Sequence, residues 1–226
     1  MDPTERREYD GDGLTETALA STPHEQVQSW VADALRRSRD QADVPEPTAL
    51  SVATVDAQGR PDVRTVLMRF SDARGPGFVT NTDSTKGVQL SANPAIAASL
   101  TWPAMYRSIR FRGTATEVSR EEVAGYFGSR PWGSRISAWT SQQSQPIDGR
   151  VELESAYARY AEQFPDRGTP DDVPVPPFWG GYRIDCDTVE FWAGRRNRLH
   201  DRLLFVRVGS GLLDEPSAWT VERRQP

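Results

Sequence analysis

The chain has 226 residues, a length typical of one domain or two small ones, and 37% of them are hydrophobic, which is enough for a substantial core. Its formal net charge of -5 argues against a nucleic-acid partner held by overall positive charge. One cysteine, Cys186, excludes an intrachain disulfide, and two histidines with one cysteine are too few for a convincing zinc site. With no signal-peptide core and no apolar run of membrane length, we expect a cytoplasmic protein without a membrane partner.

Residues 1–21 are polar and lack periodicity, so we expect a mobile N-terminal arm ahead of a single domain over 22–226. Thr22-Pro23-His24-Glu25 has the pattern of a capping box with proline at the first helical position, and an amphipathic helix follows. Further helices are expected over 84–90, from a second capping box at 119–122 through about 127, and over 153–164.

After Pro47 the apolar period changes to two, which is typical of strands. Strands are expected over 49–55, 63–70, 77–80, 95–102, 108–118, 181–193, 203–208 and 218–223. Antiparallel strands with helices inserted between them indicate an α+β fold built on a small β-barrel. The sequence contains no internal repeat and no glycine-rich nucleotide-binding motif.

The first of three candidate sites is an anion site that combines two arginines with a helix start. Arg64 and Arg69 flank an expected strand, and Lys86 lies in the first turn of the short helix that follows Asn81-Thr82-Asp83-Ser84-Thr85. Hydroxyls, free backbone N–H groups and a lysine can converge on a phosphate there. Solvated charges at an ordinary helix N-terminus are the alternative.

Tyr126, Arg130 and Ser134 form the second candidate site. Tyr126 and Arg130 are four residues apart and share a face if the helix continues that far. A phenol, a guanidinium and a hydroxyl can together hold a phosphomonoester. The alternative is a helix end whose arginine compensates the helix dipole.

The third candidate is the densest cluster of charge in the chain, over 190–202. Four arginines and the second histidine fall within eight residues, next to Trp192. A guanidinium can stack on an aromatic ring while an imidazole exchanges protons. An exposed hairpin loop is the structural alternative.

These clusters belong to a series of motifs that resembles the pyridoxamine 5′-phosphate oxidase family over nearly the whole chain. The motifs are Arg6-Arg7-Glu8-Tyr9, Glu46-Pro47-Thr48-Ala49, Arg64-Thr65-Val66-Leu67, Ser129-Arg130-Pro131, Ser141-Gln142-Gln143-Ser144, Pro176-Pro177-Phe178-Trp179-Gly180-Gly181-Tyr182, Val189-Glu190-Phe191-Trp192 and Arg198-Leu199-His200-Asp201-Arg202. The last two separate this family from other split-barrel flavoproteins.

The resemblance implies a split β-barrel and a homodimer with two FMN sites at the subunit interface, with a dimerisation and active-site segment over about 179–226. It implies oxidation of pyridoxamine or pyridoxine 5′-phosphate to pyridoxal 5′-phosphate, with O2 as acceptor and H2O2 as product. The alternatives are a sibling FMN oxidase acting on another aromatic substrate, as in phenazine biosynthesis, and a flavin- or pyridoxal-phosphate-binding protein without catalysis.

The resemblance also implies roles for individual residues. FMN would be held by Arg64, Thr65, Val66, Leu67, Met68, Arg69, Val79, Thr80, Thr85, Lys86, Ser108, Gln143, Ser144, Trp192 and Arg202. The substrate would meet Arg69, Tyr126, Arg130, Ser134, Arg198, Leu199 and His200, with Arg6, Arg7, Glu8 and Tyr9 closing over it. Arg198 and His200 would be catalytic, with Arg198 pressing the pyridine ring against the flavin and His200 accepting or relaying a proton.

Three positions depart from the family pattern. Arg69 stands where lysine is usual, Thr85 where arginine is usual, and Ser108 where glutamine is usual. Arg69 keeps its charge but changes reach, Thr85 removes a cation from the flavin phosphate, and Ser108 shortens a contact to the flavin ring.

Overall fold

The computed structural model describes residues 8–226. Its helices are α1 (Pro23–Gln41), α2 (Thr85–Ala92), α3 (Arg120–Ser129), α4 (Trp132–Thr140) and α5 (Arg150–Gln163). Its strands are β1 (Ala49–Val55), β2 (Pro61–Leu67), β3 (Phe70–Asp72), β4 (Gly75–Asn81), β5 (Ala95–Trp102), β6 (Arg107–Glu117), β7 (Trp179–Ala193), β8 (Asp201–Arg207) and β9 (Trp219–Arg223).

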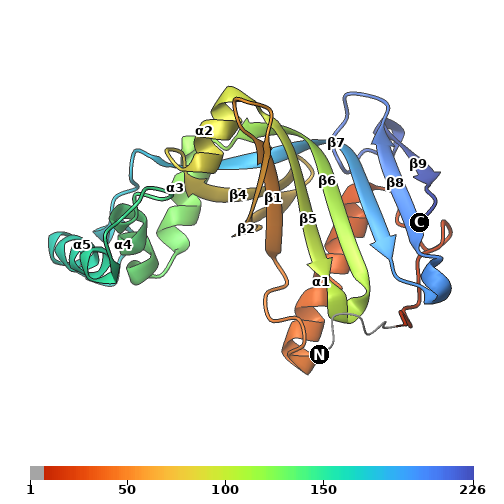
Figure 1. Cartoon of the computed structure of the whole chain (residues 1–226), viewed down its shortest axis with the longest axis horizontal. Helices are drawn as coiled ribbons and strands as arrows, with labels where there is room; N and C mark the ends of the chain where they lie inside the picture. Colours follow the sequence, from red (N-terminus) through yellow and green to blue (C-terminus); the bar gives the residue numbers. More distant parts are fainter. Residues whose placement is uncertain (1–7) are drawn as a thin grey trace.

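All nine strands form one curled antiparallel sheet in the order β2-β1-β5-β6-β7-β4-β3, with β8 and β9 attached to β7 (Figure 1). β7 organises this sheet, because one of its edges pairs along β6 while the other pairs first with β4 and then with β8. The pairing of β6 with β7 shifts register between Arg112 and Gly113. The two strands approach closely there, because a side chain at Gly113 would meet the Asp185 carbonyl oxygen at 1.9 Å.

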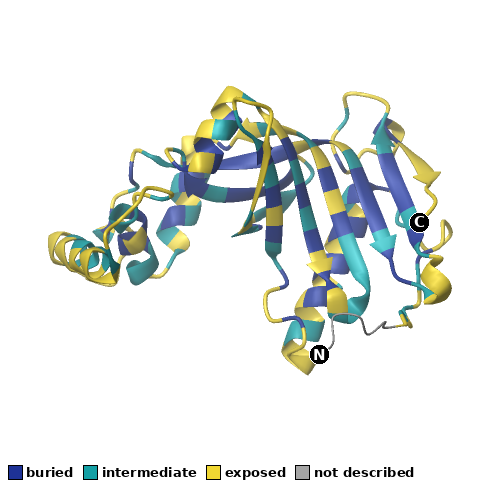
Figure 2. Ribbon diagram, viewed as in Figure 1, coloured by how far each residue is buried: buried dark blue, intermediate teal, exposed yellow. Residues whose placement is uncertain are grey.

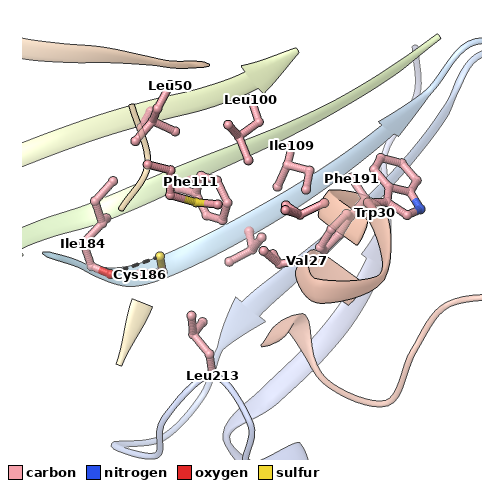
Figure 3. Packing of buried hydrophobic residues seen from close by; sticks show 14 of the residues in the cluster. Val27, Trp30, Leu50, Leu100, Ile109, Phe111, Ile184, Cys186, Phe191 and Leu213 are labelled. Carbon is pink, nitrogen blue, oxygen red and sulfur yellow. Dashed lines mark hydrogen bonds between the residues drawn. The ribbon is translucent and has the colours of Figure 1, made fainter. Parts of the chain in front are cut away.

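The main core lies between the sheet and α1 (Figure 3). Trp30 of α1 meets Phe191 of β7 edge to face, with 5.3 Å between the ring centroids. Both rings are buried, and truncating the tryptophan to alanine would cost about 3–5 kcal/mol of stability. Cys186 is buried in β7, as expected for a small hydrophobic residue in a strand.

A second, smaller core holds the helical lobe of α3, α4 and α5 together. Phe127 and Ile136 are buried there among partly buried aromatic rings, including Trp139 and Phe164, whose centroids lie 5.4 Å apart. α5 has no buried residue, and most of its surface is exposed in Figure 2. The lobe projects from the sheet at the side where β4 and α2 lie (Figure 1).

The sequence predicts β1 and β5 with both bounds correct, and β4, β6, β7, β8 and β9 within two residues at each end, but it does not predict β3 as a separate strand. The strand expected over 63–70 is wrong as one element, because the chain changes partner within it: the Met68 N–H donates to Thr48 and the Arg69 N–H to Gly77. α4 was not predicted. The first capping box is half formed, because Thr22 caps Glu25 while the Glu25 carboxylate accepts from Ser21 instead.

Residues 8–21 run along the domain without helix or strand, and Leu14 is buried in the main core. The mobility expected of 1–21 stays a prediction. Across the described part of the chain, no helix has the length and apolar character needed to cross a membrane.

Candidate functional site

A cavity of about 580 Å³ opens where β2, β4, α2 and the helical lobe meet. Its lining includes most of the residues assigned to the first two candidate anion sites. They are Asp62, Val63, Arg64, Thr65, Val66, Leu67, Arg69, Val79, Thr80, Thr85, Lys86, Tyr126, Arg130, Gln143, Ser144 and Trp179. The structure therefore brings into one cavity two clusters that are separated by 40 residues of sequence.

Lys86, the only lysine of the chain, is buried and belongs to this lining. Its ammonium group donates to Gln143 at 2.7 Å, to Thr80 at 3.1 Å and to Ser84 at 3.2 Å, and no carboxylate pairs with it among residues 8–226. Ser84 caps α2 at the Gly87 N–H and so holds the helix start against the lysine. Burial, and after it the charge of Arg64, lowers the pKa of Lys86 to about 8.

Arg64 lies beside Lys86 and is fixed from three directions. It donates to Thr54 at 2.6 Å and to Gln89 at 3.1 Å, and it pairs with Asp62 at 2.6 Å. Among the residues that the structure describes, Asp62 is the only acidic one in the cavity lining. The arginine is therefore oriented, but its charge is partly neutralised.

Arg130 is a further basic residue of the cavity lining. Its guanidinium lies over Trp179 at 4.6 Å from the ring centroid and over Phe127 at 5.7 Å. Its Nη1 atom is buried and has no hydrogen-bond partner in the described structure. Burial lowers the pKa of Arg130, and the charge of Arg69 acts in the same direction while Tyr126 opposes it. A half-buried guanidinium next to a phenol, with one buried nitrogen that is unpaired within residues 8–226, is suited to an anionic ligand.

Tyr126 and Arg130 line the same cavity, but they do not share a face of one helix as the sequence suggested. α3 ends at Ser129, and Arg130 is its C-cap in an extended conformation. The two residues therefore share the cavity because the chain turns after the helix, and not because of helical periodicity.

The charge of the cavity lining is strongly positive. Four basic residues, Arg64, Arg69, Lys86 and Arg130, face one acid, Asp62. Hydroxyl and amide groups of Thr80, Thr85, Gln143 and Ser144 complete the lining. Such a donor set fits a ligand with phosphate groups.

The third candidate cluster lies elsewhere in the chain, at the turn from β7 to β8. Figure 1 shows this turn on the right of the view, whereas α2, β2 and β4 lie toward the left. Trp192 and His200 approach within 4.8 Å between ring centroids, and Tyr9 of the N-terminal segment lies 5.3 Å from His200. Arg198 extends over Tyr9 at 5.8 Å. The aromatic and basic groups expected around the substrate ring thus do lie together here.

The backbone of this turn is unusual. Asn197 and Arg198 are consecutive residues with positive φ, 57° and 62°, a region that non-glycine residues seldom adopt. Ser144, in the cavity lining, is another, with φ 73°. Strained backbone of this kind concentrates at functional sites, where it aims particular side chains.

Several expected site residues do not line the cavity. Ser108 lies on β6 opposite Trp192 and exchanges hydrogen bonds with the hydroxyls of Ser99 and Thr101, each at 3.2 Å. Met68 is buried in the core. Ser134, Trp192, Arg198, Leu199, His200 and Arg202 are also outside the lining, as are Glu8 and Tyr9. Arg6 and Arg7 lie outside the described residues.

Two residues with a clear structural role were not singled out from the sequence. Trp179 supports the Arg130 guanidinium, and its own Nε1 atom is buried without a partner among the described residues. Asp201 is buried and accepts three hydrogen bonds, described below. Both belong to motifs that carried the resemblance, but only their tertiary contacts show what they do.

Comparison with protein-family models identifies two consecutive regions. Residues 39–164 match a model described as pyridoxamine 5′-phosphate oxidase. Residues 179–226 match one described as the pyridoxine 5′-phosphate oxidase C-terminal dimerisation region. The chain belongs to the pyridoxamine 5′-phosphate oxidase family. It is thus a member of a flavin-dependent oxidoreductase family with a split-barrel α+β fold.

Relatives and solved structures extend over the same length. A pyridoxine/pyridoxamine 5′-phosphate oxidase from Kineococcus radiotolerans is 46% identical, with 100% of this chain and 99% of the relative covered. One from Streptomyces avermitilis is 45% identical, covering 100% and 96%. The crystal structure of PhzG from Burkholderia lata 383 in complex with tetrahydrophenazine-1-carboxylic acid matches with a TM-score of 0.81 at 28% identity, covering 96% of this chain and 99% of that one. An FMN-binding family member from Nostoc punctiforme has the same fold, with a TM-score of 0.67 at 20% identity over 92% of this chain and all of that one.

Proposed function

We propose that this chain is a cytoplasmic, homodimeric FMN-dependent oxidase. It would oxidise pyridoxamine and pyridoxine 5′-phosphate to pyridoxal 5′-phosphate, with O2 as acceptor and H2O2 as product. The observation that carries the proposal is a cavity lined by two groups of cations, Lys86 with Arg64 and Arg130 with Arg69, in a chain whose full-length relatives bear the name of this oxidase. Two phosphate groups, one on the flavin and one on the substrate, would each use one such group.

FMN fits the part of the cavity that is lined by Lys86. The ammonium group would bind the flavin phosphate together with Thr85 and the oriented Arg64, and Gln143 would release its hydrogen bond with Lys86 in part. The 64–69 segment, which leaves the ladder of β1 at Met68, would lie along the flavin and supply backbone contacts. Bound FMN would supply the two-electron acceptor that the protein itself lacks.

The substrate phosphate fits the part of the cavity that is lined by Arg130. Arg130, supported by Trp179, has a buried nitrogen without a partner, and Tyr126 and Arg69 lie beside it. A phosphomonoester there would satisfy the unpaired guanidinium nitrogen and screen the repulsion between the two arginines. This part of the cavity favours a phosphorylated substrate over an unphosphorylated aromatic acid.

A second copy of the chain would complete the site. Trp192, Arg198, His200 and Arg202 do not line the cavity of their own chain, yet they gather at the β7–β8 turn within the dimerisation region. We infer that each protomer presents this turn to the cavity of its partner. Sedimentation of the FMN-loaded protein should give about twice the 25.2 kDa chain mass, and a fully active monomer would contradict the assignment.

Within that assembled site, the protein's part in catalysis is orientation and exclusion of water. Arg198 would hold the substrate ring against the flavin, and Tyr9 would close over it. Positive charge from Arg69 and Arg130 would fix the phosphate and thereby the position of the reacting carbon.

An oxidase assay of the FMN-loaded protein tests the proposal most directly. H2O2 production should follow addition of pyridoxamine or pyridoxine 5′-phosphate and should be absent with a reduced phenazine-carboxylic acid precursor. Turnover of the phenazine precursor alone would make the chain a sibling oxidase. FMN binding with no H2O2 from any of the three substrates would leave a flavin-binding protein without oxidase activity.

A further inference from the structure

Asp201, the first residue of β8, is buried and lies at the centre of a hydrogen-bond network next to His200. Its carboxylate pairs with the Arg195 side chain, accepts from Arg223 at 2.6 Å and accepts from the Leu14 N–H at 2.9 Å. Although burial acts in the opposite direction, the hydrogen bonds from Arg195, Leu14 and Arg223 lower the pKa of Asp201. The carboxylate is therefore ionised and fully engaged near neutral pH.

The same network reaches the His200 imidazole through Arg195. The Arg195 backbone N–H donates to His200 Nδ1 at 3.1 Å, while its side chain is anchored on Asp201. Gly13 leaves room for this anchor, because a side chain there would meet the Arg195 guanidinium at 2.2 Å and φ is +73°. A neutral imidazole that accepts at Nδ1 carries its proton on Nε2.

Asp201 also holds the segment that packs against the His200 ring. Its bond to the Leu14 N–H fixes the N-terminal segment, and a pair of hydrogen bonds from Arg223 to Glu16, at 2.6 and 2.9 Å, continues the attachment. Five residues before Leu14, Tyr9 lies against His200, tilted by 51°. One carboxylate thus restrains both Arg195, which donates to the imidazole, and the segment that carries Tyr9.

We propose that Asp201 is a positioning residue that fixes His200 as the neutral Nε2–H tautomer, so that His200 serves the substrate as a hydrogen-bond donor. The role toward substrate rests on the function proposed above, whereas the tautomer does not. It differs from the proton-accepting role expected from the sequence, because the only nitrogen able to accept a proton already accepts the Arg195 N–H.

The charged and titratable groups around the ring are consistent with a neutral imidazole. Arg198, Asp201 and Tyr9 face it. Partial burial, and after it the charge of Arg198, lowers the pKa of His200, while Asp201 acts in the opposite direction. Removing the Asp201 charge alone would therefore lower this pKa further.

NMR of the full-length, FMN-loaded protein labelled with 15N-histidine can test the proposal, because the chain has only two histidines. His24→Gln assigns the second imidazole. In the wild type, His200 Nδ1 should show the shift of an unprotonated acceptor and Nε2 that of a protonated nitrogen. A protonated Nδ1, or a mixture of tautomers, would overturn the proposal.

Asp201→Asn separates positioning from charge. If Asp201 positions the ring, the variant should show mixed tautomers and a His200 pKa that rises toward its ordinary value as the imidazole becomes solvated. A pKa that falls, with the tautomer kept, would mean that Asp201 acts by charge only and would contradict positioning. kcat/KM should fall about tenfold while FMN affinity is retained. Asp43→Asn, which breaks a comparable pair with Arg37 elsewhere, should change neither nitrogen.

Arg195→Met provides an independent variant in case Asp201→Asn does not fold, because Arg195 is partly exposed and Asp201 keeps Arg223 and the Leu14 N–H. It should also produce mixed tautomers, and a wild-type tautomer in this variant would refute the link through Arg195. If the wild type has no oxidase activity but shows the Nε2–H tautomer, the proposed function is wrong and the positioning role of Asp201 stands. If the wild type is active but shows the Nδ1–H tautomer, the proposed function stands and the positioning role is wrong.

Discussion

The cavity and the β7–β8 turn are both rich in basic residues, but they use their charge in opposite ways. At the turn, Arg195 pairs with Asp201, Arg196 with Asp10 and Arg202 with Glu190. In the cavity, Lys86 and Arg130 have no acidic partner among residues 8–226, and the pKa of each is lowered by burial. The turn has the greater density of arginines in sequence, yet the cavity has the greater capacity for anions.

This difference shows that the number of cations in a segment does not measure its affinity for phosphate. An arginine already paired with a carboxylate gains little from a new anion, whereas a buried, unpaired cation gains a charge-assisted hydrogen bond and loses a desolvation penalty. The paired arginines of the turn fix geometry instead. Arg198 is the exception there, since among the described residues it has no ion pair and lies over Tyr9.

Among the changes that distinguish the cavity from the β7–β8 turn, Lys86→Met should have the largest effect, which is a loss of FMN affinity. Removing a buried cation from the phosphate site should weaken FMN binding by about 2–5 kcal/mol, measured by fluorescence titration of the apoprotein. Lys86→Arg keeps the charge and should recover part of the affinity. Wild-type FMN affinity in Lys86→Met would mean that the flavin phosphate binds elsewhere.

Arg198→Ala should have a smaller effect, and this effect should be on substrate turnover rather than on FMN binding. Loss of the charge that orients the substrate should reduce kcat/KM by roughly 100-fold, within the range for truncating a charged contact in a site, while FMN affinity stays unchanged. Steady-state kinetics with pyridoxamine 5′-phosphate provides the measurement. Arg196→Ala, two residues away and paired with Asp10, is the matched control and should be nearly silent. Loss of FMN from Arg198→Ala would make the turn structural.

Thr85→Arg should increase the affinity of the cavity for FMN and so widen the difference between the cavity and the β7–β8 turn. Thr85 is exposed at the first position of α2 and lines the cavity, so an arginine there adds a cation without displacing packed atoms. FMN affinity should increase by roughly 1.5–3 kcal/mol, less where Lys86 already satisfies the phosphate. Thr85→Ala should leave the affinity nearly unchanged. Weaker binding by Thr85→Arg would show that residue 85 faces away from the phosphate.

The pH dependence of FMN binding should be the smallest effect. The apoprotein holds the pKa of Lys86 near 8, below its ordinary value of 10.5, whereas a bound phosphate stabilises the ammonium form. Above pH 8 binding must take up a proton, so the affinity should fall by up to about tenfold per pH unit. The lowered pKa also affects folding. As pH rises from about 8 to 10.5, the free energy of unfolding of the apoprotein should increase, because the unfolded chain binds more protons than the folded chain over this range. Titrations in Lys86→Met should lose this slope.

Local patterns predicted what depends on neighbours in sequence. Strict alternation gave the bounds of β1, and proline after a capping residue placed the start of α1. α4 was missed because its apolar residues are recognisable as a helix face only against α5 and the 164–175 segment, which bury them. Trp179 and Asp201 were missed as functional residues for the same reason, since their partners Arg130 and Leu14 are remote in sequence.

The grouping of residues into sites was only partly accessible from the sequence. Two clusters read separately, around Lys86 and around Arg130, face the same cavity. The third cluster lies apart from it, although the resemblance assigned all three to one site. A sequence does not state which contacts are made within a chain and which are made between two copies.

The solitary lysine has a consequence for chemical self-protection. Pyridoxal 5′-phosphate is an aldehyde, and aldehydes condense with primary amines to form Schiff bases. Apart from two histidines, which are not primary amines, all other basic side chains of this protein are arginines, whose guanidinium groups stay protonated and do not react in this way. Lys86 itself is buried in the cavity, where bound flavin would cover it. An enzyme that releases such an aldehyde would thus present no lysine side chain on its surface for its own product to modify.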